Sequence, residues 1–129
     1  MMNAVAHRGP DDRGEYLSSG ISLGHTRLAI LDTSYRGKQP MFSPDRKVVS
    51  VFNGEIYNFN ELRSKYLNEY HFHSGSDAEV IPYLYEKFGI EFIHKLRGIF
   101  AIGIYDMRSK FLYLVRDRFG VKPLYYTFQ

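Results

Sequence analysis

Two almost wholly apolar runs near the end of the sequence constrain the fold more than any other feature. The runs Ile99–Tyr105 and Phe111–Val115 are made almost entirely of aliphatic and aromatic residues, and the short polar segment 106–110 joins them. A connection of this length between two strand-like runs is typical of an antiparallel hairpin. Because apolar side chains occupy successive positions, both faces of the resulting sheet must be covered by other parts of the chain.

Further strands are predicted on both sides of this hairpin. Val48–Phe52 is rich in β-branched residues and predicts a buried strand. Segments 14–18 and 21–26 flank a Ser-Ser-Gly turn and predict a second hairpin, whose second strand continues through 28–31. One more strand is expected over 124–128.

Two segments carry the spacing of a helix capping box. The first, at 58–61, predicts a helix over about 59–68. The second, at 76–79, predicts a helix that ends near Gly89, because glycine readily adopts the conformation that terminates a helix. Pro82 lies inside this second pattern and has no amide hydrogen, so we expect a late helix start or a kink there.

The predicted fold is therefore α+β, with two largely antiparallel sheets and outer helices. An αββα sandwich and a two-layer α+β domain both satisfy the pattern. The length of 129 residues predicts a single domain, and the eleven tyrosines and ten phenylalanines favour sheet.

The composition argues against several functional classes. The net charge of +3 arises from cations scattered among anions, which argues against nucleic-acid binding, and no stretch approaches the roughly 20 apolar residues of a membrane span. The chain has no cysteine, which excludes disulfides and cysteine-ligated metals and is compatible with a cytoplasmic protein. His71 and His73 are too few ligands to predict a metal site.

Asn53-Gly54 follows a strand and has two open interpretations. It is a typical two-residue hairpin turn. Alternatively, the glycine amide and the asparagine side chain form an oxyanion hole, in which two N–H donors stabilise one developing negative oxygen.

Three charged residues also have two interpretations each. Arg27 is either a surface residue or a clamp for a carboxylate, which its planar guanidinium binds through two parallel bonds. Asp77 is either a helix-start acid or a partner for an ammonium group. Together with Glu55, these residues suit a free α-amino acid. The charged segment 116–122 is interpreted as a set of structural ion pairs.

Six motifs, taken in order, resemble the glutamine amidotransferase domain (class II, N-terminal-nucleophile type) of glutamine-hydrolysing asparagine synthetase. Order and spacing match over essentially the whole chain, and the last motif favours this branch over other amidotransferases. The motifs are His7–Gly14, Leu23–Asp32, Phe52–Asn58, Gly75–Val80, Gly98–Ala101 and Arg116–Tyr126.

The resemblance implies the αββα sandwich of N-terminal-nucleophile hydrolases. It also implies hydrolysis of glutamine to glutamate and ammonia by an N-terminal cysteine, with transfer of the ammonia to a second domain that activates aspartate with ATP and Mg. No cofactor is implied for the domain itself. By resemblance, Arg27 holds the substrate carboxylate, and Glu55 and Asp77 take the ammonium group. The remaining implied residues are the backbone of Leu28, Ile30 and Leu31 in the pocket wall and Asn53 and Gly54 in the oxyanion hole.

The departures from the family pattern carry expectations of their own. With the nucleophilic cysteine absent, we expect an inactive single partial domain over 1–129, truncated at both ends and without the ATP-binding synthetase domain. An exposed sheet edge would then favour a homo-oligomer. The alternative function is a non-catalytic glutamine-binding or protein-interaction domain.

Overall fold

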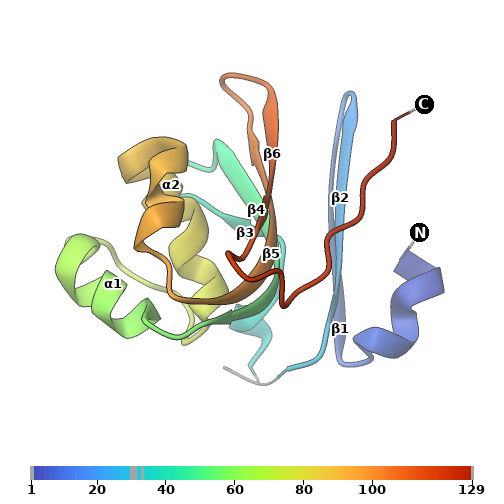
Figure 1. The fold of residues 1–129 in the computed structure, drawn as a ribbon, viewed down its shortest axis with the longest axis horizontal. Coiled ribbons are helices and arrows are strands. Elements are labelled where there is room, and N and C mark those ends of the chain that lie inside the picture. Colours follow the sequence, from blue (N-terminus) through green and yellow to red (C-terminus); the bar gives the residue numbers. More distant parts are fainter. Residues whose placement is uncertain (1, 30–31, 33, 129) are drawn as a thin grey trace.

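The computed structural model describes residues 2–29, 32 and 34–128, and within them the chain forms two antiparallel sheets (Figure 1). The small sheet pairs β1 (Asp12–Ser18) with β2 (Ile21–Arg27). The large sheet has the strand order β3-β4-β5-β6. Its strands are β3 (Met41–Phe42), β4 (Val48–Ile56), β5 (Gly98–Asp106) and β6 (Phe111–Arg116).

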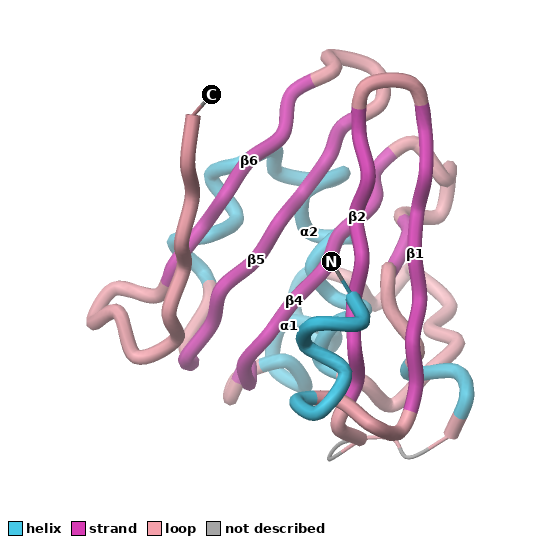
Figure 2. Tube along the Cα trace, turned by 90° about the vertical axis from the view of Figure 1, so that its right-hand side faces the viewer, coloured by secondary structure: helices cyan, strands magenta, loops and turns pink. Residues whose placement is uncertain are grey.

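The elements are stacked in layers. Helices α1 (Phe59–Tyr66) and α2 (Val80–Phe88) cover one face of the large sheet, and the small sheet lies against its other face (Figure 1). A 3₁₀ helix over Met2–Arg8 packs on the outer side of the small sheet (Figure 2). The layers confirm the predicted α+β fold of two sheets with outer helices. Among the described residues, no helix combines the length and apolar character needed to cross a membrane.

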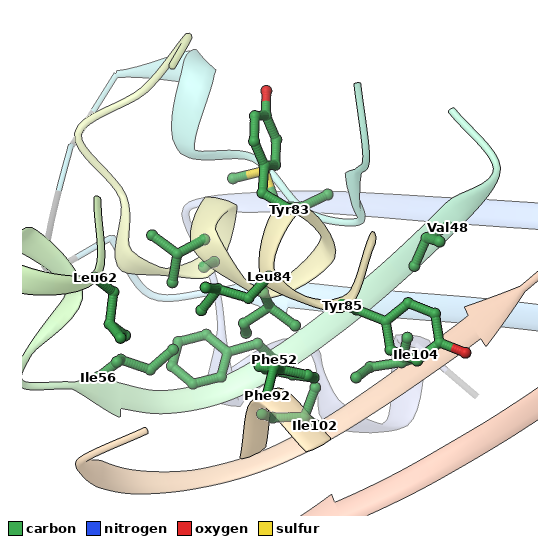
Figure 3. Close-up of a cluster of buried hydrophobic side chains, with 14 of the residues drawn as sticks. Val48, Phe52, Ile56, Leu62, Tyr83, Leu84, Tyr85, Phe92, Ile102 and Ile104 are labelled. Carbon is green, nitrogen blue, oxygen red and sulfur yellow. The ribbon is translucent and has the colours of Figure 1, made fainter. Parts of the chain in front are cut away.

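The main core lies between the large sheet and the helices. Val48, Phe52 and Ile56 alternate along β4 and point to this side, as expected for a strand whose side chains alternate between faces. They meet apolar side chains of α1, α2, β5 and the 3₁₀ helix Gly89–Lys95 (Figure 3). The largest fully buried members include Phe92, Ile56, Leu62, Leu84, Ile102 and Ile104.

A smaller apolar cluster joins the two sheets. Its buried members are Leu23 of β2, Val49 of β4 and Tyr105 of β5, with Tyr16 of β1 packed against them. The ring of Tyr16 lies edge-on to Phe42, with centroids 5.9 Å apart. The cluster as a whole holds the small sheet against the large sheet and thereby positions the residues discussed below.

The hairpin turn predicted at Asn53-Gly54 is wrong. Both residues lie inside β4, where Asn53 pairs with Ala101 and Gly54 with Phe100. Glycine at position 54 allows β4 and β5 to approach closely, because a Cβ there would lie 2.0 Å from the Ile99 carbonyl oxygen. The backbone φ of Gly54 is +152°. The long apolar partner strand β5 extends the pairing beyond the predicted end at Phe52.

The strand predicted over 28–31 also differs from the structure. Strand β2 ends at Arg27, residues 28 and 29 have no regular structure, and residues 30 and 31 lie outside the described part. Residues 124–128 form no strand either. Tyr125 and Phe128 are each 89% exposed, because no neighbouring strand pairs with this segment among the described residues.

The helices begin near the predicted positions but for different local reasons. Asn58 precedes α1, yet its side chain bonds to the Lys95 carbonyl and the Arg97 amide and does not cap the helix. Ser76 does cap, although it caps a 3₁₀ turn over Asp77–Glu79 that leads into α2. Helix α2 starts late, so that Pro82 falls in its first turn, where a missing amide hydrogen breaks no helical bond.

Candidate functional site

Arg27 ends strand β2, and its side chain is buried beneath the loop that follows. Its Nη1 donates to the Ser34 carbonyl at 2.9 Å, and its Nη2 donates to the Asp32 carbonyl. Gly37 makes room for it, since a Cβ there would lie 2.1 Å from Nη2. The loop therefore fixes the plane of the guanidinium group.

A cavity of about 310 Å³ opens beside this guanidinium. The acids at its wall are already engaged: Asp11 accepts a bond from the Ala29 amide at 2.8 Å, and Asp12 pairs with Lys38 at 3.0 Å. Its lining consists of Asp11, Asp12, Arg27, Ala29, Ser34 and Tyr35.

Strand β4 faces β2 at this end of the molecule. His25 lies beside the Phe52 carbonyl, and burial lowers the pKa of His25, with the positive charge of Arg27 acting in the same direction. Asn53 and Glu55 are exposed and lie on the face of β4 opposite Phe52. The sheets thus bring the Arg27 strand next to the Asn53-Gly54 strand.

Strand β3 pairs with only Val49 and Ser50 of β4. Beyond the start of β3, side chains pair with the backbone at this edge of β4. The Phe52 amide donates to Gln39 Oε1 at 2.6 Å, and Gln39 Nε2 donates back to the Phe52 carbonyl at 3.0 Å. The Ile56 amide donates to Asp77 Oδ2 at 2.8 Å. Since amides of an extended strand alternate in direction, that of Gly54 is directed to the same edge, between Gln39 and Asp77.

Asp77 is a buried acid beside a second acid. Burial raises its pKa even though the Ile56 amide donates to it, and the negative charge of Glu55 raises it further. Two carboxylates in this arrangement repel one another, so a bound cation would relieve the repulsion. Glu55 and Asp77, called the acidic pair below, therefore interact through their charges.

The segment that carries Asp77 is held from behind by Glu79. The Glu79 carboxylate accepts bonds from the amides of His73 and Ser74, at 2.8 and 2.9 Å. Arg63 lies 3.7 Å from it and donates to the Ser76 carbonyl at 2.7 Å. Glu79, which the sequence analysis placed in the capping motif at 76–79, therefore also holds the loop 73–77 in place.

Within the described residues, a hydrogen bond joins the loop after Arg27 to the loop that carries Asp77. The Gly75 amide donates to Asp32 Oδ2 at 2.6 Å. Arg27 is thereby linked through Asp32 to the segment that carries Asp77. However, the cavity beside Arg27 is not lined by Asn53, Gly54, Glu55 or Asp77.

The other candidate residues lie as follows. Leu28 is 58% exposed just beyond the end of β2, and Ile30 and Leu31 lie outside the described residues. The rings of His71 and His73 are 5.6 Å apart but lie in a loop. The described part of the chain contains no group of three or more His, Cys, Asp or Glu side chains placed to hold a metal ion.

Sequence reasoning assigned no role to Asp32, Ser34 or Gln39. Asp32 lies inside one of the six motifs, which was a usable signal. Ser34 and Gln39 lie in a stretch predicted as plain loop, and nothing in the local pattern marks them. Their importance depends on which backbone groups the fold leaves unpaired.

Within the described residues, the charged segment 116–122 is held by bonds between side chains and backbone groups and not by the predicted ion pairs. The Arg116 side chain donates to the carbonyls of Gly120 and Lys122. The Asp117 carboxylate accepts bonds from the amides of Phe100, Phe119, Val121 and Lys122. A turn with several unpaired backbone groups uses charged side chains to satisfy them.

Comparison with known proteins decides the family. The family model of a glutamine amidotransferase domain matches residues 1–129. The chain belongs to this family. The amidotransferase domain predicted from the six motifs is thereby confirmed.

The domain is similar to several curated relatives over nearly its whole length. It is 44% identical to glutamine-hydrolyzing asparagine synthetase 2 of Bacillus subtilis over 98% of this chain and 17% of the relative. It is 44% identical to glutamine-hydrolyzing asparagine synthetase B of Escherichia coli, over 94% of this chain and 22% of the relative. It is 42% identical to amidase chyE of Penicillium rubens, over 98% of this chain and 19% of the relative. The chain thus spans about a fifth of the length of these relatives.

Proposed function

We propose that this domain binds free glutamine as the amidotransferase part of an asparagine-synthetase-like enzyme. In the complete enzyme, glutamine is hydrolysed to glutamate and ammonia, and the ammonia is transferred to aspartate. One observation carries the proposal: the Gly75 amide donates to Asp32, which joins the loop that orients the buried Arg27 to the loop that carries the buried Asp77, and an α-amino acid requires such a cation and such an anion.

The carboxylate of glutamine binds to Arg27. Each terminal nitrogen of a guanidinium carries two N–H groups. The bonds to the Asp32 and Ser34 carbonyls orient the guanidinium plane, and a guanidinium is the group that binds a carboxylate through two parallel bonds. By the family resemblance, the backbone of Leu28 would add to the pocket wall; Ile30 and Leu31, assigned to the same wall, lie outside the described residues.

The ammonium group of glutamine binds between Glu55 and Asp77. Burial and mutual repulsion disfavour the ionised state of Asp77, and a cation restores it. This arrangement selects a substrate with a free α-amino group over a carboxylic acid amide that lacks one.

The side-chain amide of glutamine is polarised by Asn53 and Gly54. The edge of β4 directs the Gly54 amide into the gap between Gln39 and Asp77, and Asn53 precedes it on the same strand. Donors fixed by a strand need no rearrangement when negative charge develops on the amide oxygen, which is the physical basis of an oxyanion hole.

The 129 residues contain no cysteine, so they lack the thiol nucleophile of this chemistry. We therefore expect this chain alone to bind glutamine without hydrolysing it. ATP and Mg would act in a synthetase domain, and the amidotransferase domain needs neither.

Isothermal titration calorimetry with L-glutamine tests the proposal. We expect binding that weakens at least tenfold in Arg27→Lys and in Asp77→Asn, while Asp45→Asn binds as the unchanged chain does. Absence of any heat with L-glutamine would refute glutamine binding. Release of ammonia by the purified chain would refute its inactivity.

We also infer that the domain associates with further protein, which fits the alternative of an interaction domain. Strand β6 is an unpaired edge among the described strands, and Leu112 and Leu114 on it are 46% and 49% exposed. An apolar edge strand favours pairing with another chain. Sedimentation velocity tests this: we expect a dimer of this chain, and a single monomeric species across concentrations contradicts it.

A further inference from the structure

We propose that Asp32 is a positioning residue that couples the carboxylate-binding and ammonium-binding halves of the glutamine pocket. This inference rests on the proposed function. It assigns a role to a residue that contacts neither end of the substrate and acts through Arg27 and Gly75.

Asp32 is bonded to both halves at once. Its backbone carbonyl accepts a hydrogen bond from Arg27 Nη2, on the carboxylate side. Its carboxylate Oδ2 accepts a bond from the Gly75 amide at 2.6 Å, on the ammonium side. A displacement of Asp32 therefore moves both partners together.

The second carboxylate oxygen of Asp32 also acts on Arg27, through Ser34. Asp32 Oδ1 accepts bonds from the amide of Ser34 at 3.0 Å and from its hydroxyl at 2.5 Å. Ser34 in turn offers its carbonyl to Arg27 Nη1. Asp32 thus holds Arg27 both through its own carbonyl and, by way of its carboxylate, through Ser34.

The contact with Gly75 controls the acidic pair. Gly75 is followed by Ser76, whose hydroxyl caps the turn, and by Asp77, which holds the Ile56 amide. Glu55 is the neighbour of Ile56 on β4. The chain from Gly75 to the acidic pair is short and hydrogen-bonded at successive positions, so it transmits a shift of Gly75.

The chemistry of Asp32 suits this role. The hydrogen bond from the Ser34 hydroxyl and that from the Gly75 amide lower the pKa of Asp32, so the carboxylate is ionised at neutral pH and accepts on both oxygens. Its backbone has φ of 49°, a left-handed conformation that aspartate and asparagine tolerate better than most residues. Asp32→Asn therefore keeps the backbone and removes one acceptor.

The test compares three ligands by NMR titration of the unchanged chain and of Asp32→Asn. The ligands are L-glutamine, 4-carbamoylbutanoate, which lacks the amino group, and 4-aminobutanamide, which lacks the carboxylate. We expect glutamine to bind about 5- to 150-fold more weakly to Asp32→Asn, the range of typical coupling between sites. Each half-ligand should lose less than threefold, because it uses one half of the pocket only.

Asp45→Asn is the matched control. Asp45 Oδ1 also accepts bonds from a serine hydroxyl, that of Ser43 at 2.6 Å, and from a backbone amide, that of Lys47 at 3.0 Å. It lies in the turn before β4 and touches neither Arg27 nor Gly75. We expect no change for any ligand.

The outcomes separate this inference from the proposed function. If the unchanged chain does not bind glutamine, the proposed function fails. If it binds glutamine and Asp32→Asn binds equally well, or loses all three ligands by the same factor, the coupling role fails while the function stands. Should Asp32→Asn not fold, Ser34→Ala removes one bond to the same carboxylate, and we expect a smaller loss that is again confined to glutamine.

Discussion

The two faces of the large sheet are held by different forces. On the helix side, apolar side chains from β4, β5, α1 and α2 form one continuous core that includes the fully buried Phe92. On the other side, the cluster between the sheets has three buried members, Leu23, Val49 and Tyr105, within the described residues, and partly buried apolar side chains such as Tyr16 pack against them. Further order comes from backbone amides that donate to side chains: those of Phe52, Gly75, Ile56 and Phe100 donate to Gln39, Asp32, Asp77 and Asp117, respectively.

The difference teaches where stability and specificity reside. Burial of apolar area is non-directional and tolerates small shifts of shape. A hydrogen bond to a buried backbone group depends on distance and angle, and losing it leaves an unsatisfied polar group. The helix side therefore determines whether the chain folds, and the other side determines whether the candidate site has the right geometry.

The largest expected effect separates the two apolar clusters. Phe92→Ala should lower the free energy of unfolding by about 3–5 kcal/mol, because it opens a large cavity in the helix-side core. Leu23→Ala, in the smaller cluster at 8% exposure, should cost about 2 kcal/mol. Urea denaturation at equilibrium measures both, and equal losses would contradict the comparison.

A second prediction concerns the close contact of β4 with β5. Gly54→Ala should cost roughly 2–4 kcal/mol, because the new methyl group meets the Ile99 carbonyl and the backbone becomes strained. Gly89→Ala is the matched control: its φ is also positive, at +60°, but nothing lies within 4 Å of a Cβ there. It should cost about 1 kcal/mol. Similar values from thermal unfolding would show that strand contact contributes nothing.

A third prediction concerns the polar completion of the β4 edge. Gln39→Ala should cost about 1–3 kcal/mol, because the buried amide and carbonyl of Phe52 lose their partners. Hydrogen exchange should show faster exchange of the Phe52 amide while amides paired between β4 and β5 stay protected. Unchanged protection of Phe52 would mean that Gln39 does not complete the edge.

The smallest expected effect is a dependence on pH. Four backbone amides, led by that of Lys122, lower the pKa of Asp117 from 3.8 to about 2. Because the unfolded chain binds this proton at higher pH, the stabilisation is complete above pH 4 and is lost as the pH falls toward 2. Asp117→Asn should flatten this part of the curve of unfolding free energy against pH. A parallel curve for the variant would contradict the assignment.

Several elements show how much of the fold could be predicted from the sequence. The hairpin of β5 and β6, the late start of α2, which puts Pro82 in its first turn, and the hairpin of β1 and β2 follow from local patterns, and the structure confirms them. Asn53-Gly54 shows the limit. A local preference for a turn was overridden by the apolar strand β5, which lies far along the chain and pairs with both residues.

The residues of the candidate site likewise fall into those that the sequence predicts and those that only the fold reveals. Arg27, Glu55 and Asp77 were predicted as site residues from residue type and motif order, which are properties of the sequence alone, and they remain a prediction. The roles of Gln39 and Asp32 were not predicted, because they depend on backbone groups left open beyond the start of β3 and where the loop 73–77 passes.

By itself, the sequence determined the family, the α+β class and the residue types able to hold an amino acid, because these are encoded in local patterns and in the order of motifs. The tertiary structure alone decided that Asn53 and Gly54 lie in a strand, that an aspartate joins the Arg27 and Asp77 loops, and that charged side chains close the turn at 117–122. The physical reason is that a polar group's partner is set by which buried backbone atoms the fold leaves unsatisfied, and those atoms come from distant parts of the chain.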